Sequence, residues 1–208
     1  MPRYTVEELE NLVNSREYIT KLHICGEVML KDGQKLFDIL KLFQDLKELY
    51  FERDSEDVET MCDFENIDLT VFPKLEKFNL EHYYTTIIFS PSLKELTLPY
   101  AAENIDLSMC SELEILDFGN LFVSEKFNMP NLKYLNFLKI RYDDEIKLEI
   151  SELENLKKLI LISECQTKWD FDGLKKLKCC KVMTNRQYNK ECDERMRKQM
   201  EYEYELWS

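Results

Sequence analysis

The sequence predicts an α/β solenoid, a domain built by stacking short repeats along one axis. Its main support is a pattern, apolar-x-x-apolar-x-apolar, that recurs eight times with every fixed position apolar, counting Cys180. Successive copies begin 18 to 29 residues apart, and repeats of this length must stack because none can bury its apolar face alone. The copies occupy residues 19–24, 46–51, 75–80, 93–98, 113–118, 132–137, 156–161 and 177–182. We therefore expect one solenoid domain over residues 19–183.

A second regularity lies upstream of the copies. Apolar residues stand six residues before the first position of most copies, and often eight residues before it as well. A spacing of two is typical of strands. The tetrapeptide Asn66-Ile-Asp-Leu69 recurs as Asn104-Ile-Asp-Leu107 at these positions. From residue 75 the intervals leave no room for a full helix, so we expect an outer wall of extended segments or single turns.

The N-terminal residues predict a helix over 5–16. Thr5 and Glu8 form a capping box, and apolar residues follow at helical spacing. A solenoid needs its terminal apolar layer covered. We therefore expect residues 1–18 to form an N-terminal capping helix.

The first interval between copies is helical in pattern. Asp32 can cap a helix at its start. An apolar stripe follows, and it consists of Leu36, Phe37, Ile39, Leu40, Leu42 and Phe43. In later intervals, Pro73, Pro91 and Pro130 stand two residues before a copy and indicate turns that enter the strands, because proline has a fixed φ and no donor.

Residues 184–208 leave the repeat and predict a C-terminal helix. Its narrow apolar stripe has a spacing of four, and it consists of Tyr188, Cys192, Met196, Met200 and Tyr204. We expect this helix to cap the last repeat. The alternative is an arm that projects from the solenoid and docks on a second subunit or partner.

The run Pro-x-Leu-x-x-Leu-x-Leu, repeated at about twenty residues, resembles the leucine-rich repeat superfamily in its irregular forms over residues 19–183. The resemblance implies a curved solenoid of about eight repeats. It also implies one parallel strand per repeat on the concave face, where a partner is usually held. The chain departs from the family in that most copies lack the Asn or Cys expected three residues after the third apolar position.

The charge of the chain excludes some classes of partner. The formal net charge of -13 at pH 7 repels phosphate backbones and anionic headgroups, so we expect neither nucleic acid nor membrane binding. A basic or neutral protein suits this charge better. The alternative is that the charges only keep the solenoid soluble.

We expect the cytoplasm as the compartment. The first residues contain no apolar run of signal-peptide length. The seven cysteines are odd in number and scattered, without a Cys-x-x-Cys pair, which favours reduced thiols inside a cell. The alternative is a secreted protein whose signal peptide has been removed.

No residue pattern indicates an active site. His23 and His82 lie far apart in the solenoid, and neither accompanies a nucleophile in a catalytic arrangement. Cys179, Cys180 and Cys192 come closest to a metal cluster, but adjacent cysteines on a strand point to opposite faces. We therefore expect no enzyme, no cofactor and no bound metal.

The implied concave face predicts a binding surface. Residues between the apolar positions of a strand face outward, and in the later copies several of them are large and apolar. Six would form one patch: Ile115, Tyr134, Leu138, Ile160, Ile162 and Met183. Two alternatives stay open. In the first, the C-terminal helix folds back and covers the patch. In the second, the sixth copy takes the other register that Phe137-Leu-Lys-Ile140 allows, which scatters the patch.

We expect the chain to be a non-catalytic scaffold or adaptor that binds a protein partner on its concave face. A second copy of the chain, in a homo-oligomer, stays open as one such partner. One alternative is a secreted pathogen effector or a self-assembling structural repeat protein. Another is the substrate-recognition subunit of a ubiquitin ligase, although the N-terminal eighteen residues are too short to hold an F-box.

Overall fold

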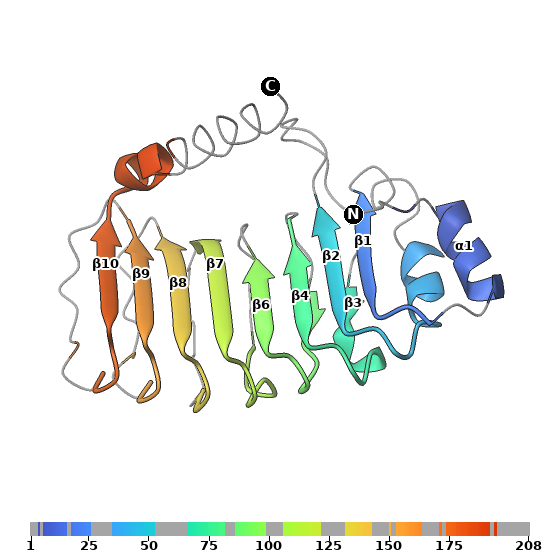
Figure 1. Ribbon diagram of the computed structural model, residues 1–208, viewed down its shortest axis with the longest axis horizontal. Helices are drawn as coiled ribbons and strands as arrows, with labels where there is room; N and C mark the ends of the chain where they lie inside the picture. Colours follow the sequence, from blue (N-terminus) through green and yellow to red (C-terminus); the bar gives the residue numbers. More distant parts are fainter. Residues whose placement is uncertain are drawn as a thin grey trace, which may run out of the picture.

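A computed structural model describes residues 4, 6–15, 18–25, 35–52, 66–81, 86–98, 106–121, 132–142, 150, 153–163, 171, 174–191 and 194. These residues form a parallel β-solenoid (Figure 1). Its main sheet has eight strands, and every pair of neighbours is parallel. In spatial order they are β1 (Lys21–Cys25), β2 (Glu48–Glu52), β4 (Lys77–Leu80), β6 (Glu95–Leu98), β7 (Ile115–Leu121), β8 (Phe137–Tyr142), β9 (Lys158–Ile162) and β10 (Cys179–Met183).

Seven strands follow the predicted copies, but the sixth copy takes its second register. Phe137 pairs with Ile115 across β7 and β8, and Leu138 pairs with Leu116. The buried set is therefore Leu135-x-x-Leu138-x-Ile140, three residues later than predicted. A shift by an odd number of residues turns every side chain of a strand to the other face.

Two successive tight turns lead into most strands. Before β7, the amide of Cys110 donates to the carbonyl of Leu107 (2.9 Å), and the amide of Leu113 donates to the carbonyl of Cys110 (3.2 Å). This geometry buries a residue three positions before the first apolar position, which the sequence pattern did not reveal. Its members are Phe43, Phe72, Ser90, Cys110, Leu132, Leu153 and Leu174. Pro73 and Pro91 lie in these turns as predicted, while Pro130 lies outside the described residues.

The recurring tetrapeptide places an aspartate at the same point of a turn twice. Asp68 Oδ1 accepts a hydrogen bond from the amide of Thr70 at 2.9 Å. Asp106 Oδ1 accepts one from the amide of Ser108, also at 2.9 Å, and this bond lowers the pKa of Asp106. The repeated Asp therefore satisfies an amide that a turn would otherwise leave unpaired.

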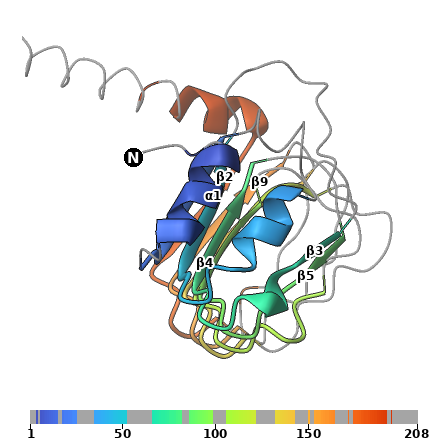
Figure 2. The same cartoon turned by 90° about the vertical axis from the view of Figure 1, so that its right-hand side faces the viewer.

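The outer wall combines strands, turns and a short helix, in line with the lengths of the intervals. β3 (Asn66–Asp68) and β5 (Thr86–Ile88) pair in parallel, and η1 (Leu69–Val71) follows β3. Residues 35–40 are helical. Figure 2 shows this helix and the two short strands on one side of the main sheet. The strand prediction therefore holds at β3 and β5. In the next repeat, Leu107 starts a turn, and residues 104 and 105 lie outside the described part.

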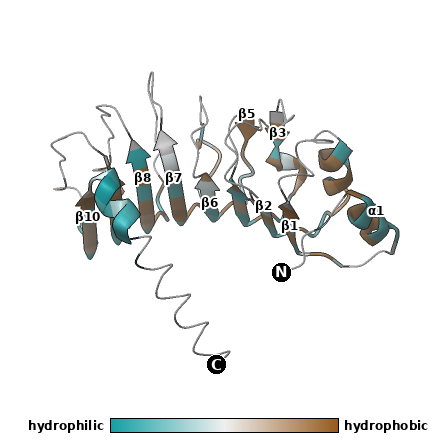
Figure 3. Ribbon diagram, turned by 90° about the horizontal axis from the view of Figure 1, so that it is seen from above, coloured by the Kyte–Doolittle hydropathy of each residue, from teal (hydrophilic) through white to brown (hydrophobic). Residues whose placement is uncertain are grey.

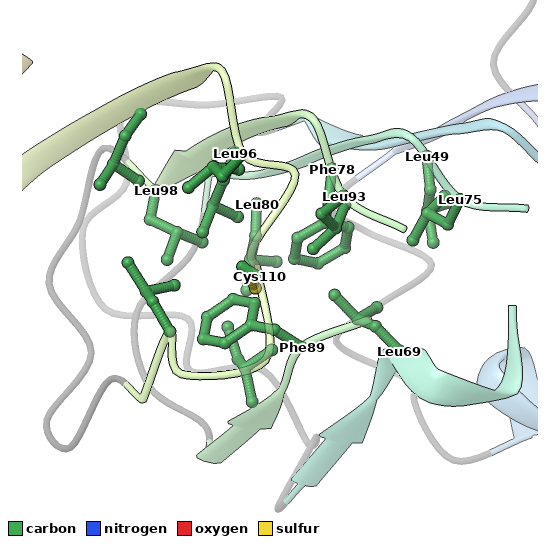
Figure 4. Close-up of a cluster of buried hydrophobic side chains, with 14 of the residues drawn as sticks. Leu49, Leu69, Leu75, Phe78, Leu80, Phe89, Leu93, Leu96, Leu98 and Cys110 are labelled. Atoms are coloured by element: carbon green, nitrogen blue, oxygen red, sulfur yellow. The ribbon is translucent and has the colours of Figure 1, made fainter. Parts of the chain in front are cut away.

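The core fills the space between the main sheet and this wall. Phe78 and Leu96 from the sheet pack there with Phe89 and Cys110 from the wall (Figure 4). The predicted helical stripe of the first interval is buried except for Leu42, which is 61% exposed. At the N-terminal end, α1 (Val6–Ser15) buries Leu9 in the same core. That α1 acts as a cap stays a prediction.

Among the described residues, no helix is both long and apolar enough to cross a membrane.

Candidate functional site

The candidate site is the face of the main sheet that points away from the core, which we call the open face. Buried and partly exposed residues alternate along the strands, so two rows of side chains cross this face. From β1 to β10, the first row contains Lys21, Glu48, Lys77, Glu95, Ile115, Phe137, Lys158 and Cys179. The second row contains His23, Tyr50, Asn79, Thr97, Asp117, Lys139, Ile160 and Lys181.

Opposite charges alternate along the first row over its first four strands. Lys21 Nζ lies 2.7 Å from Glu48 Oε2, and Lys77 Nζ lies 2.9 Å from Glu95 Oε1. Such cross-strand pairs stabilise neighbouring strands modestly. Because the charges already satisfy one another, this half of the face has little need of a charged partner.

Tyr50 is the centre of a small cluster on β1 and β2. Its ring stacks on His23, with centroids 4.4 Å apart and planes 7° from parallel. Its hydroxyl donates to Glu48 Oε2 at 3.0 Å. Burial and this hydrogen bond raise the pKa of Tyr50 to about 12, while the hydrogen bond from Lys21 lowers the pKa of Glu48.

The raised pKa of Tyr50 predicts a loss of stability in alkaline solution. Its pKa is about 12 in the folded protein and about 10 in an unfolded chain, so folding favours the protonated phenol. This contribution is complete below about pH 10 and is lost as the pH rises towards 12. We expect Tyr50→Phe to lose less stability over this range in urea unfolding followed by circular dichroism. Tyr18→Phe, at a 70% exposed position, is the control. Identical pH curves for wild type and Tyr50→Phe contradict the assignment.

The charge alternation ends at β7 and β8, where the first row becomes apolar. Ile115 and Phe137 are register partners, and both are partly exposed. The ammonium of Lys158 lies 4.9 Å from the centroid of the Phe137 ring, a cation–π contact that holds the ring in place. Glu95 neighbours Ile115 on the other side. We call Ile115 and Phe137 the apolar pair.

A second helix follows β10 directly, over residues 185–191. It begins with a capping box in which Thr184 Oγ1 accepts from the amide of Gln187 (3.2 Å) and Gln187 Oε1 accepts from the amide of Thr184 (2.8 Å). Figure 3 shows this hydrophilic helix beside the strands at the β10 end of the sheet. The helix begins where the sequence predicts one after the last copy, and its role as a cap stays a prediction.

Contacts across the sheet hold this helix in place. Arg141 Nε on β8 donates to Asn185 Oδ1 at 2.8 Å, and Lys139 Nζ lies 5.1 Å from the centroid of the Tyr188 ring. Lys139 Nζ also lies 2.9 Å from Asp117 Oδ2 on β7. Burial alone would lower the pKa of Lys139, but the Asp117 charge and the Tyr188 hydroxyl outweigh it and raise the pKa.

The structure corrects half of the predicted patch. Leu138 is fully buried, because the register of β8 turns it towards the core. Ile162 and Met183 are buried as well. Ile162 lies between Arg141 and Met183 in the sheet, and the helix that starts after Met183 bonds to Arg141 beside it. That the C-terminal helix folds back over the patch with Met196, Met200 and Tyr204 stays a prediction, because these three residues lie outside the described part.

The other predicted residues are accessible but do not form one patch. Ile115 and Ile160 are partly exposed on the open face. Tyr134 is 55% exposed but lies in the turn before β8, so it is not part of the open face. The prediction missed Phe137. The second register that the sixth copy allows would have placed this residue on the open face. Partner binding by any of these residues stays a prediction.

The described residues offer little for metal or nucleophilic chemistry. Among them, no group of three or more His, Cys, Asp or Glu side chains is placed to hold a metal ion. Cys110, Cys179 and Cys180 are free thiols. Burial raises the pKa of Cys110 to about 12, which disfavours the reactive thiolate.

Comparison with known proteins gives only a distant likeness of fold. No family model matches the sequence, and no curated protein matches it. The functional domain of InlJ from Listeria monocytogenes, which includes a cysteine ladder, is similar with a TM-score of 0.43 and 15% sequence identity over 69% of this chain. This chain spans 40% of the length of that structure. A likeness at this level carries no argument about function, and the repeat fold of the chain stands on its own strand pairing.

Proposed function

We propose that this chain is a non-catalytic scaffold of the leucine-rich repeat type that binds a protein partner on its open face. The observation that carries the proposal is the apolar pair, Ile115 and Phe137, on adjacent strands in the middle of that face. On one side of it the charges pair with one another, and on the other side the helix over 185–191 contacts β8 and β10. Stacked repeats present a surface to partners and rarely supply chemistry.

The surroundings of the apolar pair define the partner's chemistry. Glu95 and Lys158 flank the pair in the first row, so the partner should insert an apolar or aromatic group and meet both charges at its rim. Burying two such side chains contributes about 3 to 6 kcal/mol, against an association cost of roughly 4 to 15 kcal/mol. The polar rim must therefore contribute as well, and we expect a weak, transient contact with a neutral or basic protein. The odd number and scattered positions of the cysteines favour a reducing compartment, so the cytoplasm remains our proposed location.

We expect Phe137→Glu and Ile115→Glu to abolish partner binding while the protein stays folded. Both side chains are partly exposed in the free protein, where a carboxylate can be solvated, but an interface would desolvate it without a partner. Such a change costs several kcal/mol, at least a hundredfold in affinity by order of magnitude. The measurement is affinity capture with the wild-type chain, followed by titration of the captured partner with each variant.

Tyr134→Glu is the matched control, because this residue is exposed, apolar and close in sequence but lies off the open face. It should bind like the wild type. A partner that binds both apolar-pair variants with unchanged affinity, while their melting temperatures match the wild type, rules out the open-face proposal.

A further inference from the structure

Among the described residues, the last strand of the main sheet has a neighbouring strand on one side only. β10 pairs only with β9 within the described sheet. The core-side residues of β9, Leu159 and Leu161, are fully buried, but their register partners Cys180 and Val182 are exposed, Val182 by 59%. β10 therefore presents both a backbone edge and apolar side chains that a further strand would cover.

A groove runs beside this edge. Its volume is about 520 Å³, and its lining combines β10 with one face of the following helix. The strand contributes its residues 180–183, and the helix contributes Gln187, Lys190, Glu191 and Glu194. An extended strand laid along β10 would fit between the two.

The lysine on this edge strand is already paired within its own chain. A lysine on an edge usually prevents further pairing because its charge would have to be desolvated. Lys181, at the centre of β10, instead forms an ion pair with Glu191 of its own helix, with Nζ and Oε2 3.0 Å apart. The charge that would oppose pairing is thus already neutralised.

The charges around β10 are complementary to each other. Exposed Lys175 and Lys178 precede the strand, while exposed Glu194 lines the groove beside it. In an antiparallel arrangement, a second β10 would bring its basic beginning towards Glu194 of the first. A parallel arrangement would not.

We propose that β10 pairs antiparallel with β10 of a second copy of this chain, about a two-fold axis at Lys181. Cys180 then faces Val182 of the second copy, with Cβ atoms about 4.5 to 5.5 Å apart, and the apolar layer continues across the axis. Lys178 meets Glu194 of the second copy, twice by symmetry. This homodimer goes beyond the proposed function, because it uses the edge of the sheet and leaves the open face accessible.

The first test is the mass of the chain in solution. Light scattering after size exclusion, over about a hundredfold range of concentration, should show twice the 25.1 kDa of one chain at the high end. Val182→Glu should return the mass to one chain and weaken dimerisation by more than about a hundredfold, with an unchanged circular dichroism melting curve. Ile88→Glu is the matched control, because Ile88 is also apolar and 51% exposed but lies on β5, and it should dimerise normally.

The second test reads the register directly. In a background with Cys179→Ser and Cys180→Ser, Lys181→Cys places one thiol opposite its copy, within the Cα distance that a disulfide needs. A mild oxidant should then give a covalent dimer on a non-reducing gel, whereas Thr97→Cys on β6 should not. A wild-type chain that stays monomeric throughout, a dimer that Val182→Glu leaves intact, or no enrichment of crosslink at position 181 over position 97 overturns the proposal.

Discussion

Leu138→Ala is expected to lower the free energy of unfolding by about 2 to 5 kcal/mol. Leu138 is fully buried, between Leu116 of β7 and Leu159 of β9 in the register of the sheet. Removing its branched end leaves a cavity that neighbouring repeats cannot close, because both are held by their own strand pairing. Urea unfolding followed by circular dichroism measures the loss.

The adjacent residue provides the control. Phe137 is larger than Leu138 but lies partly exposed on the open face, so Phe137→Ala should cost only about 1 kcal/mol. Leu96→Ala, at a fully buried position of β6, calibrates the cost of a core leucine where the register was predicted correctly. If Phe137→Ala proves the more damaging of the two neighbours, the sixth repeat has the register first predicted from the sequence.

Most of the sheet could be predicted because its signal is local. Each strand needs only six residues of the right pattern, and stacking of like repeats then brings equal positions into register, as Leu96 and Leu116 show. The sixth copy failed because two copies overlap there, starting at Leu132 and at Leu135. Both bury three apolar residues, so the local pattern cannot choose between them. Pairing with β7 decides, and it places Leu132 in the turn before the strand.

The open face was harder to predict because contacts distant in sequence reshape it. The hydrogen bond from Arg141 to Asn185 joins residues 44 positions apart. The apolar periodicity of neither segment predicts this contact. That contact ties the helix to the strand beside Ile162, a buried residue that alternation alone assigned to the surface. Phe137 gained its exposure from the register shift in the same region. The described strands of the N-terminal half of the face follow the predicted alternation, as β4 and β6 show.

The same long-range contacts make Asp117→Ala costly, with an expected loss of about 2 kcal/mol in the free energy of unfolding. Asp117 and Lys139 retain only 23% and 19% of their side-chain exposure, so removing the carboxylate leaves a largely desolvated ammonium without its charge partner. The pair of Lys77 and Glu95 has the same length, 2.9 Å, but 34% and 37% exposure. Glu95→Ala should therefore cost less than about 1 kcal/mol.

A double-mutant cycle separates the ion pair from simple loss of packing. Asp117→Ala combined with Lys139→Met removes both charges and keeps most of the lysine's length, so it should be more stable than Asp117→Ala alone. Because Lys139 also contacts Tyr188, the single variant should loosen the helix over 185–191, visible as faster amide hydrogen exchange in those residues. The idea fails if Asp117→Ala and Glu95→Ala lower the free energy of unfolding equally and amide hydrogen exchange in the helix is unchanged. The buried Asp117–Lys139 pair would then not join the helix to the sheet.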